Sequence, residues 1–425
     1  MKTTTIIKTS LVVTALLLSA CGGGGSSSSD DTLASSFADE MGLQDEYPDD
    51  YQEPTGEEDL SQNTTDNSPD QEVKDQDNQN TVEYDTKADI ALAQKEPYFK
   101  YAWHLSSKNS ALNDNGYEID KSADINITDA WRLTMGQNVK VAVIDDGGEV
   151  NHEEIKANLF KAYNADDGSS DVSVKNEEGS HGNTCAGCIV SSINGKGYVG
   201  VAPKAQLIII RQEEESDANV IKAFEYAKDQ GAKVISCSWG TNDVSDILVS
   251  ELKSIYDAGI TVLFASGNEG DSLDKDGVND ESEVEWVIGV GASVENNDVG
   301  SYSNYGKNID IIAPAGDTQE SSGLLGIDDM GERGGENQLG IVNNNYQFVD
   351  GTSFATPISA GVVALMYSIN PTITPKQVRE ILIKTASKVG QGYDDNGFEE
   401  RRAYGKINAG SAVAEAQKLY LSKLN

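Results

Sequence analysis

The chain reads Asp-Gly-Thr-Ser-Phe-Ala-Thr-Pro at positions 350–357, and a run of mostly small and apolar residues follows from Ile358 to Met366. The glycine at 351 lets the backbone turn tightly just before the serine. The small side chains after the serine allow a helix to pack closely against a sheet. We therefore expect Ser353 at a helix N-terminus, where free N–H groups and the helix dipole favour developing negative charge.

A serine hydroxyl is a weak nucleophile until a neighbouring base takes its proton. The chain offers three histidines as bases, namely His104, His152 and His181. His181 begins the glycine-flanked sequence His-Gly-Asn-Thr-Cys-Ala-Gly, which leads into an apolar helix. Asp145 ends a buried-strand run, at the sheet edge where active sites collect in open α/β folds. The order Asp145, His181, Ser353 thus supplies an acid, a base and a nucleophile.

Three segments, one around each of these residues, resemble the subtilisin-type serine proteases, or subtilases. They are Val-Ile-Asp-Asp-Gly at 143–147, His-Gly-Asn-Thr-Cys-Ala-Gly at 181–187 and Gly-Thr-Ser-Phe-Ala-Thr-Pro at 351–357. The order of acid, base and nucleophile along the chain is the one found in subtilisin. The resemblance implies a serine endopeptidase that works through an acyl-enzyme. The competing class is a catalytically inactive surface lipoprotein that uses the same fold to bind proteins.

The resemblance also implies a role for each residue of this triad. Ser353 attacks the scissile carbonyl, His181 accepts its proton and later returns it to the leaving amine. Asp145 holds the imidazole tautomer and stabilises the imidazolium. His152 is the rival base, although the matching histidine of the family is structural, and His104 is expected to be structural as well.

Two further segments match parts of the family that contact the substrate. Phe-Ala-Ser-Gly-Asn at 264–268 matches the oxyanion-hole segment, so the Asn268 amide and the Ser353 N–H are the expected donors. A plain Gly-Asn turn is the alternative. The stretch Ser238-Trp239-Gly240 resembles the edge segment that pairs with an extended substrate by β-augmentation.

Several acidic residues resemble the substrate-pocket carboxylates of the kexin/furin branch of the family. Asp243 falls five positions after Ser238, where those enzymes carry a carboxylate. Asp276 follows Asn268 after a short gap, and Asp146 is expected to face the next substrate residue. Pocket carboxylates pair well with cations and reject neutral groups, so the resemblance implies cleavage after Arg or Lys. The alternative is that an acid-rich chain carries Asp at many positions without such a role.

The stretch 191–198, followed by Gly-Val-Ala-Pro at 200–203, resembles the calcium loop of the family. Asn194 and backbone carbonyls are the expected oxygen ligands, which suit Ca²⁺. Glu96 and Glu154 stand where relatives carry Asp, so the expected structural calcium site departs from the family pattern at two positions.

Three cysteines remain after Cys21, namely Cys185, Cys188 and Cys237. An odd number leaves at least one free thiol. Cys185 and Cys188 share a helix at a spacing of three, which is an awkward geometry for a disulfide. A cysteine nucleophile paired with His181 is conceivable, but the serine already has its full motif, so packing is the expected role.

Strand and helix patterns alternate from position 91 to 425, which predicts one α/β domain. The resemblance implies a subtilisin-like three-layer sandwich with a central, mostly parallel sheet flanked by helices. The expected buried strands are 139–144, 206–211, 233–237, 260–265, 284–290 and 309–312. The expected helices are 184–192, 216–229, 244–258, 353–369, 375–387 and 408–424.

Residues 1–20 are predicted to form a signal peptide, because two lysines precede an apolar run that is too short to span a membrane. Ala20 followed by Cys21 is similar to a bacterial lipobox, in which that cysteine is lipidated and becomes the mature N-terminus. An ordinary cleaved signal peptide is the alternative. The lipobox implies a membrane-attached protein of the bacterial cell envelope, outside the cytoplasm, at the outer membrane or the cell surface.

Residues 21–90 are acidic and poor in large apolar side chains, so we expect a flexible, disordered linker behind the lipidated cysteine. An inhibitory propeptide is the alternative role for this stretch. The formal net charge of −38 argues against nucleic acid as a partner. No folded propeptide is recognisable before Glu96, so a separate chaperone-like or propeptide-like partner is expected to assist folding or maturation.

Overall fold

The computed structural model describes residues 86–174, 180–213, 216–241, 243–274, 280–335 and 340–424. The predicted signal peptide, Cys21, nearly all of the expected linker and Asp276 lie outside the described residues. Helix α1 (Lys87–Ala93) begins inside the last few residues of the stretch 21–90 that composition predicts as a disordered linker. Ile90 packs against the hydrophobic core, and Asp89 forms an ion pair with Lys204 at 2.6 Å. Both contacts order the chain slightly before the domain boundary that we expect at 91.

A seven-stranded sheet of order β2-β3-β1-β4-β5-β6-β7 forms the centre of the fold, and all of its neighbouring strands run parallel. The strands are β1 (Lys140–Asp145), β2 (Leu159–Asn164), β3 (Gln206–Arg211), β4 (Val234–Cys237), β5 (Thr261–Ala265), β6 (Val287–Ser293) and β7 (Ile309–Pro314). Because all strands point the same way, their carboxyl ends meet at one edge of the sheet.

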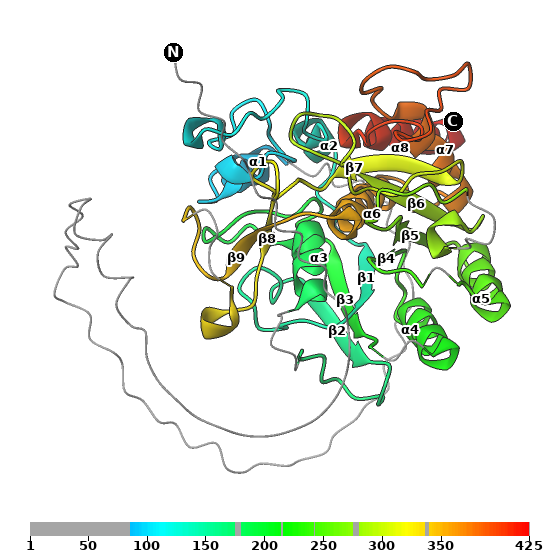
Figure 1. The fold of residues 1–425 in the computed structure, drawn as a ribbon. Helices are drawn as coiled ribbons and strands as arrows, with labels where there is room; N and C mark the ends of the chain where they lie inside the picture. The colour runs from blue at the N-terminus through cyan, green and yellow to red at the C-terminus, as the bar shows by residue number, and fades with distance from the viewer. Residues whose placement is uncertain are drawn as a thin grey trace, which may run out of the picture. The chain divides into compact units, whose positions relative to one another are not determined.

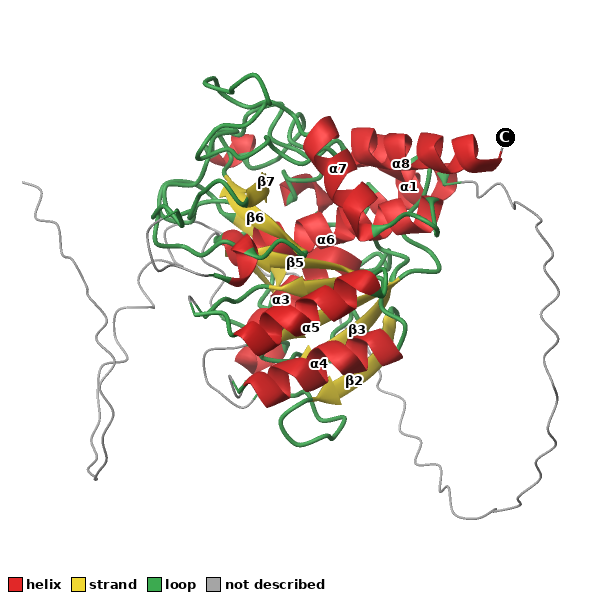
Figure 2. Cartoon of the chain, turned by 90° about the vertical axis from the view of Figure 1, so that its right-hand side faces the viewer, coloured by secondary structure: helices red, strands yellow, loops and turns green. Residues whose placement is uncertain are grey.

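Helices cover both faces of this sheet (Figure 1 and Figure 2). The longer ones are α3 (His181–Val190), α4 (Asp217–Asp229), α5 (Asp246–Asp257), α6 (Thr352–Ile369), α7 (Pro375–Thr385) and α8 (Ala409–Leu424). The short ones are α2 (Ile127–Trp131), η1 (Phe99–Tyr101), η2 (Asn113–Asn115), η3 (Glu281–Glu283) and η4 (Gly331–Arg333). Helices α4 and α5 cover one face, and α3 and α6 cover the other.

Strand β1 shows why the sequence of the sheet is continuously apolar. Val141 and Val143 pack into the core beneath α3 and α6, whereas Ala142 and Ile144 pack into the core beneath α4 and α5. Successive side chains of a strand face opposite sides, so a sheet covered on both faces needs apolar residues at every position. This arrangement confirms the predicted three-layer α/β fold.

Helix α6 runs through the interior, and 15 of its 18 residues are buried. Among the described residues it is the one helix long and apolar enough to cross a membrane, and its burial identifies it as a core helix instead. Gly361 makes its close packing feasible, since a Cβ atom there would lie 2.6 Å from Cβ of Val201.

A small antiparallel sheet of β8 (Leu324–Ile327) and β9 (Tyr346–Val349) packs on α3. The Thr184 hydroxyl donates to the carbonyl of Ile327 at 2.7 Å, and Gly187 accommodates the Ile327 side chain. The pair β8–β9 therefore supports the helix that begins with His181.

Several elements differ from the sequence expectation. The strand expected at 284–290 begins later, at Val287, because Glu281–Glu283 form a helical turn first. The sequence patterns also miss the edge strand β2 and the pair β8–β9. The helix expected at 184–192 begins earlier, at His181, because the Ser180 hydroxyl caps it by accepting from the N–H of Asn183 at 3.1 Å.

Candidate active site

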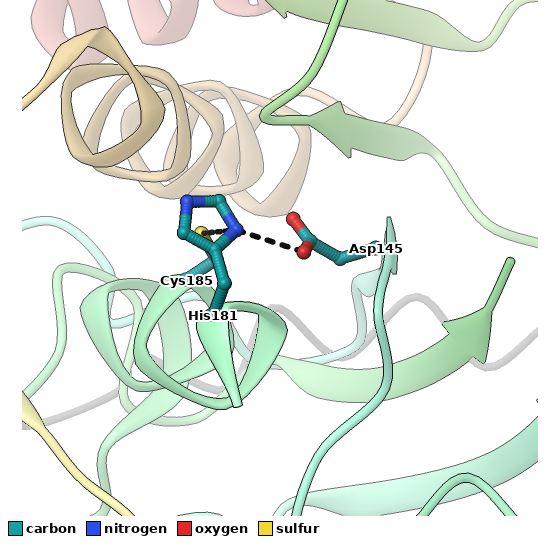
Figure 3. Close-up of side chains that lie close together, drawn as sticks. All are labelled: Asp145, His181 and Cys185. Carbon is teal, nitrogen blue, oxygen red and sulfur yellow. Dashed lines mark hydrogen bonds and ion pairs between the residues drawn. The ribbon is translucent and has the colours of Figure 1, made fainter. Parts of the chain in front are cut away.

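The carboxyl end of β1 and the first turn of α3 bring Asp145 and His181 together. Nδ1 of His181 lies 2.8 Å from Oδ1 of Asp145 (Figure 3). Asp145 is buried, whereas the His181 side chain is 37% exposed, so one face of the imidazole remains open. Burial lowers the pKa of His181, but the charges and hydrogen bonds of Asp145 and Cys185 together outweigh burial and hold this pKa well above 6.5. The carboxylate therefore orients the imidazole and stabilises its charged form.

Asp146 fixes the position of His181 through the backbone. Its carboxylate accepts hydrogen bonds from the N–H groups of His181 at 3.0 Å and Gly182 at 2.7 Å. These are unpaired donors of the first turn of α3, where a negative charge is stabilised by the helix dipole. Burial and the charge of Asp145 nevertheless raise the pKa of Asp146 to about 6. Asp146 also lines a cavity, as expected, but its carboxylate is engaged by the helix.

Ser353 lies in the first turn of α6, as the sequence predicts. Its hydroxyl donates to the carbonyl of Ser238 at 3.3 Å, and within the described residues it shares no hydrogen bond with His181. The two residues are nevertheless neighbours, because Sγ of Cys185 lies 3.9 Å from Nδ1 of His181 and 3.5 Å from the carbonyl oxygen of Ser353. The ring of Phe354 lies 5.4 Å from the imidazole, centroid to centroid.

The side-chain carbonyl of Asn268 holds this residue beside Ser353. Its Oδ1 accepts from the N–H and the hydroxyl of Thr352, both at 2.9 Å. Oδ1 is committed in this way, and Asn268 lines the same small cavity as Ser353. This is the arrangement that an oxyanion donor requires.

The small cavity beside Ser353 has a volume of about 170 Å³. Its acidic residues are Glu269 and Asp280, which the sequence analysis does not single out. Asp280 is buried, and a Cβ atom on Gly240 would lie 2.7 Å from its Oδ2, so the carboxylate lies against the segment 238–240. Burial raises its pKa, and the charges of Glu281 and Glu269 add to this effect. The sequence signal for Asp280 is its place in the same acidic stretch as Asp276.

A larger cavity of about 480 Å³ lies on the other side of Trp239 and Gly240, which line both cavities. Its acidic lining residues are Asp145, Asp146, Glu213, Asp217, Asp243 and Glu281. The structure thus places Asp243 in this larger cavity and not in the small one next to Ser353. Glu281 stabilises the end of the segment 238–241, since its carboxylate accepts hydrogen bonds from the N–H and the hydroxyl of Thr241 at 2.8 and 2.6 Å.

The three residues expected to bind calcium do come together. Oε1 of Glu96 accepts from the N–H groups of Asn194 and Gly195, both at 2.8 Å, and Nδ2 of Asn194 lies 3.1 Å from Oε2 of Glu154. Oε2 of Glu96 is buried without a hydrogen-bond partner. Burial, with the nearby charge of Glu96, raises the pKa of Glu154 to about 8. These two buried carboxyl groups and the Asn194 amide offer oxygen ligands of the kind that Ca²⁺ prefers, and a bound cation would favour the ionised form of Glu154.

The other two histidines lie in structural positions. His152 uses Nδ1 to accept from the N–H of Glu154 at 3.1 Å, and its Nε2 lies 3.3 Å from the carbonyl oxygen of Asn345. His104 is fully buried, and burial lowers its pKa to about 3. The described cysteines, Cys185, Cys188 and Cys237, are buried free thiols.

Comparison with known proteins identifies the family. The profile of the Subtilase family, peptidase S8, matches residues 136–405, which is more than half of the chain. A calcium-dependent protease of Nostoc sp. is 31% identical over 353 residues, which cover 74% of this chain and 51% of that protein. Subtilisin DY of Bacillus licheniformis is 30% identical over 262 residues, which cover 61% of this chain and 87% of the subtilisin. The chain thus spans about half the length of the Nostoc protein.

Solved structures share the fold. A protease of Pseudoalteromonas arctica has a TM-score of 0.63 at 24% identity, covering 76% of this chain and 99% of its own. A serine protease of Aeromonas sobria, solved in complex with a chaperone, has a TM-score of 0.63 at 21% identity. The match covers 76% of this chain and 67% of the Aeromonas chain. Together with the sheet edge that gathers an acid, a base and a serine, the profile and the sequence relatives establish that this chain belongs to the subtilase family of serine proteases.

Proposed function

We propose that the chain is a serine endopeptidase whose triad is Asp145, His181 and Ser353. The observation that carries the proposal is the 2.8 Å contact between Asp145 and His181, placed beside the helix turn that presents Ser353. A catalytically inactive binding protein has no need for a buried carboxylate aimed at an imidazole, nor for an amide oriented like that of Asn268.

The reaction begins when the Ser353 hydroxyl leaves the Ser238 carbonyl and turns toward His181. Such bonds are often long or unmade without substrate and tighten when substrate binds. His181 then accepts the proton as the oxygen attacks the scissile carbonyl, and the developing oxyanion receives hydrogen bonds from Asn268 Nδ2 and the Ser353 N–H. His181 returns the proton to the leaving amine, and a water molecule hydrolyses the acyl-enzyme with the same base.

We propose a preference for Arg or Lys before the scissile bond, as in the kexin/furin branch. Asp280 and Glu269 support this at the small cavity, and six carboxylates support basic residues further along the substrate at the larger one. A buried carboxylate pairs strongly with a cation and rejects a neutral side chain. In this assignment Asp243 contacts a substrate residue that lies in the larger cavity, and Asp280 takes the place expected for Asp243. Asp276 lies outside the described residues.

Calcium is proposed as a structural ion held by Glu96, Glu154 and Asn194. When bound it supplies positive charge that offsets two buried carboxylates and fixes the turn at 194–195. A relative of this chain is named a calcium-dependent protease, which supports the proposal.

The N-terminal assignments remain proposals that rest on sequence. Residues 1–20 would direct export, Cys21 would carry the lipid anchor, and residues 21–90 would tether the peptidase domain 91–425 to the bacterial envelope. A separate chaperone-like partner would assist folding, and the Aeromonas sobria serine protease solved with a chaperone supports that idea by fold alone. Metabolic labelling with a fatty-acid analogue tests the anchor, since Cys21→Ser should remove the label from the exported protein.

Two experiments test the enzyme proposal. A fluorophosphonate probe should label the wild-type chain and leave Ser353→Ala unlabelled, and an unlabelled but folded wild type would favour the binding-protein alternative.

Cleavage profiling on a peptide library should then show basic residues at the cleaved position, and Asp280→Asn should lower the preference for Arg over Leu by at least about tenfold. A wild-type preference for apolar residues would contradict the assignment of the two acidic cavities.

A further inference from the structure

A third cavity, which the proposed function leaves without a role, opens at the same edge of the sheet. It has a volume of about 520 Å³ and is lined by residues that closely follow β6 and β7, together with residues 116–118. Its acidic lining residues are Glu118, Glu295, Asp317 and Glu320. None of the described residues that line it is Lys, Arg or His, so its wall carries negative charge only.

The three cavities follow one another along the sheet edge, because neighbouring strands carry them. Residues at the ends of β3, β1 and β4 line the larger cavity, and residues at the ends of β4 and β5 line the small one. The third cavity belongs to the ends of β6 and β7, the next two strands in the sheet order (Figure 1). The small cavity beside Ser353 therefore lies between the other two.

Hydrogen bonds connect the third cavity to the turn that presents the nucleophile. The N–H of Thr318 donates to the carboxylate of Asp350 at 2.6 Å. The Tyr302 hydroxyl accepts from the N–H of Gly351 at 3.2 Å and donates, at 2.6 Å, to the carbonyl of the residue just before Asp317. Asp317 lies between these two attachment points, so its position is fixed relative to the residues that precede the nucleophile.

A separate observation shows an unsatisfied carboxyl group in this cavity. Glu295 lines the cavity but is only 1% exposed, and its Oε2 is buried without a hydrogen-bond partner. Its Oε1 accepts from the N–H of Gly323 at 2.6 Å and from the hydroxyl of Ser322 at 3.1 Å. Burial raises the pKa of Glu295, and these hydrogen bonds offset only part of that effect. A buried carboxyl oxygen without a partner is costly, and a cationic donor entering the cavity would satisfy it.

The geometry favours a basic side chain over a bare metal ion. All four acidic residues belong to the described part of the chain, and no three of them bring carboxyl oxygens within 4.8 Å of one another. A metal ion needs closer ligands, whereas an ammonium or guanidinium group on a flexible stem reaches separate carboxylates. Glu295 and Asp317 are buried and Glu118 and Glu320 are exposed, so a cation meets acidic groups from the mouth of the cavity to its depth. Val299 adds apolar surface on which the alkyl part of such a side chain packs.

We propose that the third cavity binds an Arg or Lys side chain of the substrate on the leaving side of the scissile bond. The inference rests on the protease activity and the basic preference proposed above. In that proposal the residue before the bond occupies the small cavity, and more distant residues on the same side reach the larger one. An extended substrate that continues along the sheet edge past Ser353 then meets the third cavity. There Glu295 and Asp317 receive the cation, and Glu320 meets it at the mouth.

Cleavage kinetics test the cavity directly. A set of peptides carries Arg before the cleaved bond and Lys in place of Gln at one of the first six positions after it. Mass spectrometry follows cleavage after that Arg alone. At one or two neighbouring positions Lys should raise kcat/KM at least about tenfold, as expected for charge-assisted hydrogen bonds. Equal rates for Lys and Gln at all six positions would overturn the proposal.

Two substitutions assign the preference to this cavity. Glu295→Gln removes the buried carboxyl group, and Glu320→Lys reverses an exposed charge without entering the core. Each should bring the ratio of the Lys rate to the Gln rate close to one. Glu225→Lys on α4 makes the same charge change far along the chain and should keep the wild-type ratio, and Asp280→Asn should also keep it. A wild-type ratio in Glu320→Lys and in folded Glu295→Gln would contradict the assignment.

A binding test separates this proposal from the enzyme proposal. Fluorescence anisotropy measures the binding of two labelled peptides to full-length Ser353→Ala protein, one with Lys and one with Gln at all six leaving-side positions. The Lys peptide should bind at least about tenfold more tightly. Adding Glu320→Lys should remove this difference, and adding Glu225→Lys should keep it, with folding checked by circular dichroism. Equal binding of both peptides to the folded Ser353→Ala protein would refute the cation site whether or not the chain is a protease. Failure of fluorophosphonate labelling, in contrast, would refute the enzyme proposal alone.

Discussion

Pro357 affects the hydrogen bonding of Ser353, which lies four positions earlier in the same helix. It lies inside α6 and has no N–H, so the carbonyl of Ser353 loses the helical hydrogen bond that it would otherwise accept. That carbonyl instead accepts from the Ser238 hydroxyl at 2.7 Å and faces the Cys185 thiol at 3.5 Å. Pro357 thus leaves a carbonyl in the first turn of α6 free to contact the segment 238–240 and the helix that carries His181.

Asn268→Ala should lower kcat with little change in KM, because the amide contributes only when the oxyanion develops. The loss should be about a hundred- to a thousandfold, the range found on removing one such donor from subtilisin. Steady-state kinetics on one peptide substrate measure it. Asn396→Ala, at an exposed position of another loop, serves as the control. A large rise in KM at unchanged kcat would show that Asn268 binds substrate in the ground state instead.

The pH profile should report the influence of Asp145 on His181. The imidazole must be neutral to accept a proton, so kcat/KM should fall as the pH drops through the pKa of His181. Asp145, together with Cys185, holds that pKa above 6.5, and the acid limb of the profile should therefore lie above pH 6.5. In Asp145→Asn the limb should move to lower pH, while the plateau falls roughly ten-thousandfold. An acid limb at the same pH in both proteins would contradict the coupling.

At the scale of elements, the active site depends on how closely α6 approaches the rest of the core. Gly361 faces Val201, and a Cβ atom on the glycine would lie only 2.6 Å from Cβ of that valine. The sheet pair β8–β9 supports α3 from the opposite direction, through Thr184 and Gly187 against Ile327. The first turns of α3 and α6 are therefore positioned by small residues that lie well along each helix.

Gly361→Ala should destabilise the fold although alanine is the better helix former. The helix preference favours alanine by about 1 kcal/mol, but overpacking costs about 1 to 3 kcal/mol. The net loss should appear in the free energy of unfolding, measured by urea denaturation. The double variant Gly361→Ala, Val201→Ala is the matched control, since it opens space for the new methyl group. If Gly361→Ala alone raises stability, the close approach of the helix is not a constraint.

At the scale of the whole molecule, the chain carries a large excess of negative charge, −38 in formal terms. Some of the acidic side chains lie inside the domain, at Glu96 and Glu154, which are buried, and around the small and the larger acidic cavities. Buried charges of one sign destabilise a fold unless cations compensate them. The calcium and the basic substrate of our proposals are both cations that would do so.

Calcium removal should lower the thermal stability of the wild type and leave Glu154→Gln nearly unaffected. The glutamine keeps the shape of the side chain but removes the charge that holds the ion. Saturating calcium at about a hundred times its Kd stabilises a binding protein by about 2.7 kcal/mol, and this gain should disappear in the variant. Melting curves with calcium and with a chelator measure the difference. Glu415→Gln on α8 is the control, and an equal calcium response in both variants would place the site elsewhere.

The sequence could predict the α/β class, most of the main strands along the chain, and the helix start that carries Ser353. It could do so because these features are local: apolar runs and small residues in motifs. The start of α3 at His181 escaped prediction, since the Ser180 cap was found only in the structure. The pair β8–β9 and the edge strand β2 escaped prediction because their burial depends on what they contact and not on their own pattern.

What the sequence by itself determined is which residues are chemically suited to act, namely Asp145, His181, Ser353 and Asn268. Only the tertiary structure decided that Asp280 and not Asp243 lines the small cavity beside Ser353, and that Cys185 joins the acid and the base within 4.8 Å. The reason is physical: residue type and short-range spacing are written along the chain, whereas the distance between side chains on different strands and helices is set by packing.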